Sequence, residues 1–135
     1  FVKKVDIMDY KFKNKPRAFT VGKYNQIEIK DMGSISLKPD EQITLVTESD
    51  NETDIVRKNW GFYSSGSLNR RLTENGFKPA LVVNEFGLYY VMFVEKGRET
   101  LFQEYLDLER NFLICWLETE NLEKIKNLFN PDLPI

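Results

Sequence analysis

Residues 60–72, WGFYSSGSLNRRL, combine the residue types that could bind an anion. Aromatic residues lead into serines and a glycine, and two arginines follow. Ser67 is a favourable first residue for a helix that reaches about Asn75 and is ended by Gly76. A helix start offers unpaired N–H groups, and arginine binds phosphate or carboxylate well. The hypothesis is a site for a sugar phosphate or nucleotide sugar, formed by Trp60, Tyr63, Ser64, Ser65, Gly66, Ser67, Arg70 and Arg71.

A purely structural interpretation explains the same stretch. Ser67 then caps only its own helix, the aromatic residues belong to the core, and both arginines face water. Neighbouring helical residues also point about 100° apart, so only one of Arg70 and Arg71 could reach a given anion. The sequence does not say which one.

The absence of histidine excludes several kinds of enzyme. Ser-His-Asp and Cys-His nucleophiles, a histidine base and the usual zinc and iron sites all need it. The single cysteine cannot form an internal disulfide or a Cys-only zinc site. No glycine-rich nucleotide motif is present, so we expect no metal and no cofactor. Glu85 and Glu95 are the remaining acid/base candidates, although an isolated glutamate at a strand end is usually just solvated.

Positive charge is concentrated at the beginning of the chain. Residues 1–23 contain seven Lys or Arg and two Asp, a net charge of +5, which leaves −7 for the rest of a chain of net charge −2. Tyr10, Phe12 and Phe19 alternate with these basic residues, as in proteins that bind single-stranded nucleic acid. The acidic remainder would repel phosphate, and lysines commonly protect exposed edge strands. We therefore do not expect nucleic acid as a partner.

Hydrophobic periodicity divides the chain into two halves. Residues 1–63 are mostly β, because apolar and polar residues alternate in stretches such as 26–30 and 42–46. Pro and Gly turns separate these stretches, which predicts antiparallel hairpins with one wet face, and one further strand is expected within 53–63.

Residues 64–135 are mixed and predict the order β-β-α-β-α. A hairpin surrounds the turn at 84–87, and helical spacing follows in Leu101, Phe102, Tyr105 and Leu108. An apolar strand precedes a final helix that begins at Thr119. The prediction is a single α+β domain over 1–135, in which the first-half hairpins pack on the second half. The strand at 88–94, apolar on both faces, should be central and covered, and Cys115 should be buried and unreactive.

The function predicted from these features is that of a small non-catalytic domain. It would bind an anionic small molecule or a protein partner, and it would form a homodimer because ten Phe, six Tyr and two Trp are many for its size. One alternative is a His-free enzyme acting on a sugar-type metabolite with Glu or Tyr as acid/base, and another is a protein-interaction subunit. No segment has the length of a membrane span, so we expect a cytoplasmic protein without membrane contact.

Overall fold

The eleven elements of the described chain form three antiparallel sheets and three helices. The structure, a computed structural model, describes residues 9–22, 24 and 26–135. The elements are β1 (Asp9–Val21), β2 (Ile27–Ser36), β3 (Gln42–Val46), β4 (Glu52–Lys58), β5 (Gly61–Ser64), α1 (Arg71–Glu74), β6 (Phe77–Asn84), β7 (Tyr89–Glu95), α2 (Glu99–Glu109), β8 (Asn111–Trp116) and α3 (Thr119–Phe129). The α+β class is confirmed, as is the order β-β-α-β-α in β6, β7, α2, β8 and α3. The strand expected within 53–63 is in fact two strands, β4 and β5.

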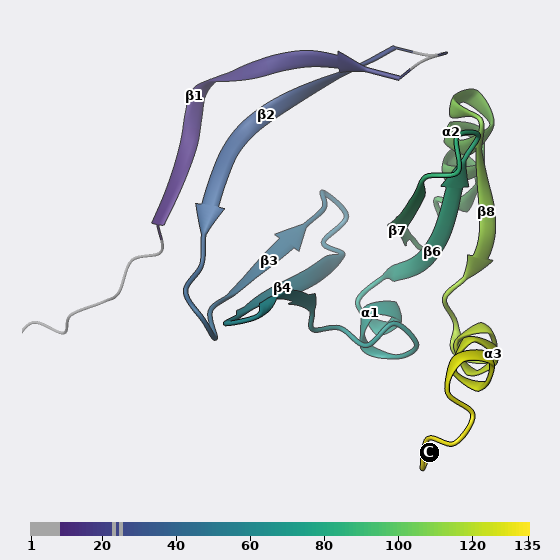
Figure 1. The fold of residues 1–135 in the computed structure, drawn as a ribbon. Coiled ribbons are helices and arrows are strands. Elements are labelled where there is room, and N and C mark those ends of the chain that lie inside the picture. Colours follow the sequence, from purple (N-terminus) through teal and green to yellow (C-terminus); the bar gives the residue numbers. More distant parts are fainter. Residues whose placement is uncertain (1–8, 23, 25) are drawn as a thin grey trace, which may run out of the picture.

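The hairpin β1–β2, which we call the arm, is a long ribbon that arches over the other elements and ends beside α2 (Figure 1). Phe12 pairs with Gly33 and Arg17 with Asp31, so β1 carries extra residues opposite a short stretch of β2. At this bulge Gly33 has a φ of 132°, and a Cβ there would lie 2.0 Å from the carbonyl oxygen of Lys11. Only glycine allows the two strands to approach so closely.

The second sheet, of order β3-β4-β5, is joined to the third sheet through its first turn. Asn51 donates a side-chain hydrogen bond of 2.7 Å to Oε2 of Glu95, at the end of β7. The N–H of Glu52 donates to the carbonyl of Asn75 at 3.3 Å. Gly76 has a φ of 99° and lies against the Asn51 side chain, so this contact also needs glycine.

The third sheet has the order β7-β6-β8 and contains the hydrophobic core. Helix α2 covers one face, where the buried side chains are Ala80, Val82, Val94 and Leu106. The prediction that strand 88–94 is central was wrong, because β7 is an edge strand and β6 is central. Tyr89 and Val91 point to the face opposite α2 and are exposed. A strand with two apolar faces can be covered on both sides, but the sequence pattern does not show which strands pair with it.

Two further expectations concern β8 and the membrane. Cys115 was predicted to be buried, but it is only half-buried, because its cross-strand neighbour Leu81 lies on the sheet face that α2 does not cover. Its reactivity stays a prediction. Within the described residues, no helix is both long and apolar enough to cross a membrane.

Candidate functional site

The loop that leads to α1 forms a turn where a longer helix was predicted. Helix α1 contains only Arg71–Glu74, so the predicted span from Ser67 to about Asn75 was wrong. Ser67 accepts a hydrogen bond from the backbone N–H of Arg71 at 3.0 Å through Oγ, and its carbonyl accepts the N–H groups of Arg70 and Leu72. These bonds close a turn before the helix begins. A helix of one turn has too few aligned peptides to attract an anion by its dipole.

Both arginines of the loop are paired with carboxylates of the protein. Nη2 of Arg71 lies 3.5 Å from Oδ2 of Asp54, a buried residue of β4. Thr44 donates a hydrogen bond of 2.6 Å to the other carboxylate oxygen of Asp54. Nε of Arg70 lies 3.5 Å from Oε1 of Glu74, one turn along the chain, and both side chains are exposed. Negative charge is therefore already present beside each guanidinium.

The serines and aromatic residues of the loop are divided between the two faces of the second sheet. The hydroxyls of Ser64 and Ser65 are buried and have no hydrogen-bond partner among the described residues. Neighbouring strand residues point to opposite faces, so Ser64 and Tyr63 diverge. Trp60 and Tyr63 stack on each other, with ring centroids 6.0 Å apart, and both are exposed. Gly66 is buried, and a Cβ added at this position would lie 3.2 Å from the backbone nitrogen of Leu72. The predicted residues are thus not brought together around one point.

The two glutamates considered as acid/base candidates hold structural positions. Glu85 accepts a hydrogen bond of 2.6 Å from the hydroxyl of Tyr24, at the tip of the arm. Glu95 accepts the bond from Asn51 that joins the second and third sheets. Among the residues that the structure describes, no three His, Cys, Asp or Glu side chains are grouped closely enough to hold a metal ion. Both glutamates are therefore engaged in contacts between elements.

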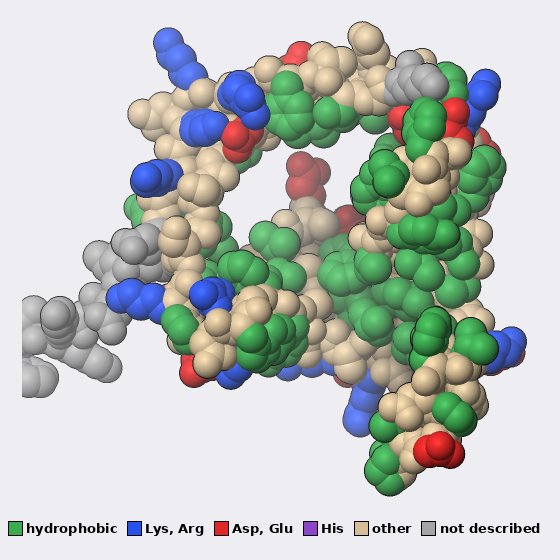
Figure 2. Space-filling model, viewed as in Figure 1, with side chains coloured by type: hydrophobic (Ala, Val, Ile, Leu, Met, Phe, Trp, Pro, Cys, Tyr) green, Lys and Arg blue, Asp and Glu red, His purple; other side chains and the backbone are tan. Residues whose placement is uncertain are grey.

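The most unusual surface of the molecule is the apolar face of the arm. The strand register and the two-residue period place seven apolar side chains on this face: Tyr10, Phe12, Phe19, Val21, Ile27, Ile29 and Ile35. The same register places Arg17 and Asp31 on this face between Phe12 and Phe19, and Asp31 forms an ion pair with Lys13. Figure 2 shows hydrophobic side chains along the inner side of the arm, beside an opening between the arm and the other elements. Phe12 is 60% exposed. Ile27 and Ile29 already alternate with polar residues in the sequence, but the sequence does not reveal that Ile29 stays 40% exposed while Ile27 is half-buried.

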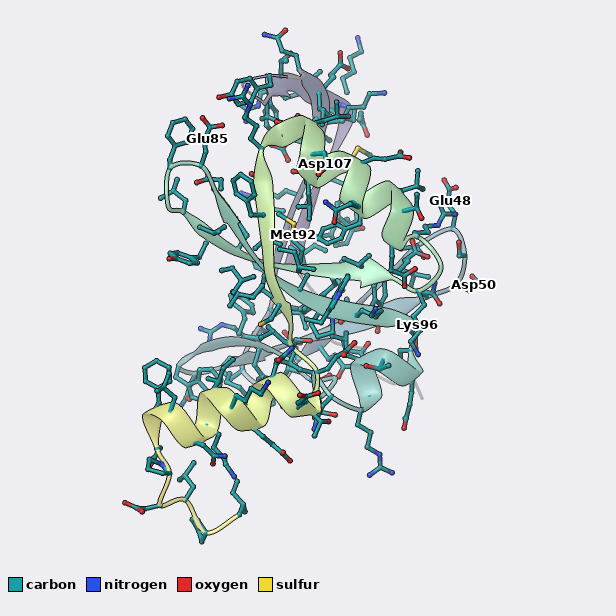
Figure 3. The ribbon with its side chains drawn as sticks, turned by 90° about the vertical axis from the view of Figure 1, so that its right-hand side faces the viewer. Glu48, Asp50, Glu85, Met92, Lys96 and Asp107 are labelled. Carbon is teal, nitrogen blue, oxygen red and sulfur yellow. The ribbon has the colours of Figure 1, made fainter. Side chains whose placement is uncertain are left out.

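The tip of the arm closes the opening on one side. The guanidinium of Arg110 lies 4.2 Å from the ring centroid of Tyr24, whose hydroxyl also contacts Glu85. Beside the tip, a cavity of about 280 Å³ is lined by Val21, Gly22 and Ile27 of the arm and by residues that include Tyr90, Met92 and Tyr105. A second cavity, of about 490 Å³, lies between β7 and α2, and its lining includes Thr47, Phe93, Leu101 and Phe102. Figure 3 shows Met92 on the side of the third sheet that α2 covers. The arm, β7 and α2 together present a large uncovered apolar region.

Comparisons with models of protein families, with curated proteins and with solved structures found no significant match. Functional inference for this chain therefore depends on its own geometry. That geometry contains an exposed apolar surface and, among the described residues, no cluster of side chains that could hold a metal ion.

Proposed function

We propose that the protein is a non-catalytic interaction domain that associates with a second copy of itself through the apolar face of the arm. The observation that carries this proposal is the exposure of that face beside an opening (Figure 2). A two-stranded ribbon is at best marginally stable in water, and it needs further apolar contacts to persist. Within the described chain, the arm meets other elements at its tip, through Tyr24. A partner along its length would supply the missing contacts.

The accessible surface of the chain supports association. It measures 10563 Å², whereas a compact monomer of 15.9 kDa exposes about 7,400 Å². Fully extended, the ten residues outside the described ranges would contribute about 1,700 Å². The remaining excess of about 1,500 Å² is larger than the roughly 800 Å² per partner that a stable interface buries.

The distribution of charge favours a second copy as the partner. Residues 1–36 contain eight Lys or Arg and four Asp or Glu, a net charge of +4. Residues 37–135 contain eleven Lys or Arg and seventeen Asp or Glu, a net charge of −6. The arm of one copy is thus attracted to the remainder of another, and such attraction promotes encounter in the correct orientation.

Sedimentation equilibrium across the micromolar range tests the proposal. We expect a mass twice the 15.9 kDa of one chain, and we expect Phe12→Glu to lower it to one chain. Met32 is equally exposed but lies on the opposite face of the arm, so Met32→Glu is the matched control and should remain dimeric. A wild-type protein that is monomeric at every concentration overturns self-association.

An anion site at residues 60–72 is the second candidate. It is favoured by the buried hydroxyls of Ser64 and Ser65, which have no partner in the described chain, and by Arg70, whose side chain is exposed and can turn. It has weaker support than self-association, because Asp54 and Glu74 already lie beside the two arginines.

A further inference from the structure

Helix α3 has an apolar stripe with very little cover. Its apolar residues are Leu122, Ile125, Leu128 and Phe129. None of the α3 residues, all of which the structure describes, is buried, and Leu128 and Phe129 are 78% and 80% exposed. An isolated helix of eleven residues is marginal in water, and most helices are stabilised by packing their apolar face. Most of the stripe therefore has no packing partner among the described residues of the chain.

The contacts that hold α3 to the rest of the chain are concentrated at its first turn. Nδ2 of Asn121 donates to the carbonyl of Trp116 at 2.8 Å, and Nδ2 of Asn69 donates to the hydroxyl of Thr119 at 3.3 Å. At the other end, Nζ of Lys126 donates to the carbonyl of Ile135 at 2.8 Å. These polar contacts fix where the helix starts and leave Leu128 and Phe129 uncovered.

The arm and α3 lie at opposite ends of the molecule (Figure 1). The apolar face of the arm therefore cannot be covered by α3 of the same chain. In a two-fold dimer every contact between two different surfaces occurs twice. The arm of each copy can therefore contact α3 of the other copy, although the two elements lie far apart within one chain. Both elements are marginal when alone, and one contact would stabilise both.

We propose that α3 of one copy packs its apolar stripe on the apolar face of the partner's arm, and reciprocally. This inference rests on the self-association proposed above and specifies its contact. The dimensions agree, because eleven helical residues span about 16 Å and the ten residues of β2 span about 33 Å. The arm is long enough to cover the whole helix. An amphipathic helix against an apolar surface is a recurrent mode of protein recognition.

Opposite charges border the two surfaces. Residues 11–17 of the arm contain Lys11, Lys13, Lys15 and Arg17 and no acidic residue. The start of α3 and the residue before it supply Glu118, Glu120 and Glu123, ahead of the first lysine of the helix at position 124. Lysine side chains can extend past an apolar contact and place their charge at its border. Within the chain Lys13 pairs with Asp31, Glu118 with Lys78 and Glu120 with Lys124. The complementarity between the acidic beginning of α3 and the basic stretch of the arm is therefore one of net charge, and both stretches must exchange some of these pairs on contact.

A complementation experiment tests the reciprocal contact. Phe12→Glu places a charge on the apolar face of the arm, and Phe129→Glu places one on the apolar stripe of α3. Both positions are exposed, so each variant should keep the far-UV circular dichroism of the wild type. Alone, each variant breaks both contacts of its homodimer and should raise the dimer Kd by roughly 100-fold or more. An equimolar mixture retains one intact contact per heterodimer, so it should dimerise more tightly than either variant alone in sedimentation velocity.

Matched controls and contrary outcomes separate the two proposals. Met32 lies on the opposite face of the arm, and Asn127 lies about 200° around α3 from Ile125. The variants Met32→Glu and Asn127→Glu should therefore dimerise as the wild type does. A monomeric wild-type protein overturns the proposed function itself. A wild-type dimer that Phe129→Glu leaves intact, or a mixture that dimerises no better than its components, overturns the arm–α3 contact and leaves self-association standing.

Discussion

The guanidinium of Arg71 lies 3.5 Å from the buried carboxylate of Asp54 and ties α1 to the second sheet. Without Arg71, that carboxylate would keep Thr44 as its hydrogen-bond donor but lose its neighbouring cation. We expect Arg71→Ala to lower the free energy of unfolding by about 1–2 kcal/mol, less than for a fully buried pair because Arg71 is well exposed. Arg70→Ala, which removes an exposed pair with Glu74, should cost less than about 0.5 kcal/mol. Urea denaturation measures both, and equal small losses would contradict a structural role for Arg71.

The same pairing makes a prediction for the anion candidate. Because Arg71 is engaged by Asp54, Arg70 is the arginine that could turn towards a ligand. If inorganic phosphate or a nucleotide sugar binds there, Arg70→Ala should weaken binding by about 1.5–3 kcal/mol, the range for a charged hydrogen bond. Isothermal titration calorimetry gives the affinities. A melting temperature that neither compound raises would remove the anion candidate.

The core of the third sheet should dominate stability. Leu106, on the side of α2 that meets the third sheet, is fully buried and packs with Ala80, Val82 and Val94. Leu106→Ala should lower the free energy of unfolding by about 2–5 kcal/mol, through lost burial and the cavity left behind. Leu108→Ala, on the same helix but 56% exposed, should change it by less than about 1 kcal/mol. Similar losses for the two variants in chemical denaturation would show that α2 is not seated on the sheet in this way.

The sequence predicted the second half of the fold well because its signals are local. Leu101, Phe102 and Tyr105 recur with a helical period, and β6 and β7 are apolar runs around a short turn, so element type follows from spacing alone. The alternation in β2 and β3 likewise identified strands, but the turn expected at 31–34 was wrong, because these residues lie inside the continuous strand β2. In each case the side chains within one element carry the information.

What could not be predicted depends on contacts between elements. Ser67 and Gly76 bracket a helical signal, yet α1 is one turn long, because Leu72 is buried directly behind the turn and Arg71 is drawn to Asp54. The central strand of the third sheet, the half-buried position of Cys115 and the uncovered face of the arm are all matters of pairing and packing. The candidate residues around 60–72 were recognised by type, but the sequence does not reveal that β5 ends at Ser64, which points Tyr63 and Ser64 to opposite faces and leaves the other candidates outside the strand.

The carboxylate of Glu99 should titrate at unusually low pH. The carboxylate accepts hydrogen bonds from the backbone N–H of Glu99 itself and from that of Gly97. The Gly97 nitrogen lies 3.2 Å and 3.0 Å from the two carboxylate oxygens. These bonds hold the pKa of Glu99 below the ordinary value of 4.5. Since the folded-state pKa is lowered, the stabilisation is present above 4.5 and is lost as pH falls through the folded pKa. NMR titration of the side-chain carboxyl carbon measures this directly. A midpoint at or above 4.5 would contradict these hydrogen bonds, and Glu99→Gln should remove this contribution to the pH dependence of stability.

The bulge of the arm should be the position most sensitive to an added methyl group. Gly33 has a φ of 132°, and a Cβ there would lie 2.0 Å from the carbonyl oxygen of Lys11. Backbone atoms cannot rotate away as a flexible side chain can, so Gly33→Ala must separate β1 from β2 around Phe12. Gly87 is the matched control, because it also has a positive φ, 76°, but no atom within 4 Å of its added Cβ.

Hydrogen–deuterium exchange followed by mass spectrometry should therefore distinguish the two variants. In Gly33→Ala, peptides from β1 and β2 should exchange much faster than in the wild type, while peptides from β6 should be unchanged, because the core of the third sheet lies in other elements. Gly87→Ala should disturb only the turn between β6 and β7, at a cost of about 1–2 kcal/mol for the left-handed conformation. If the arm carries the dimer contact, Gly33→Ala should also weaken dimerisation and Gly87→Ala should not. Arm peptides that stay as protected in Gly33→Ala as in the wild type would show that β1 and β2 do not pair at this bulge.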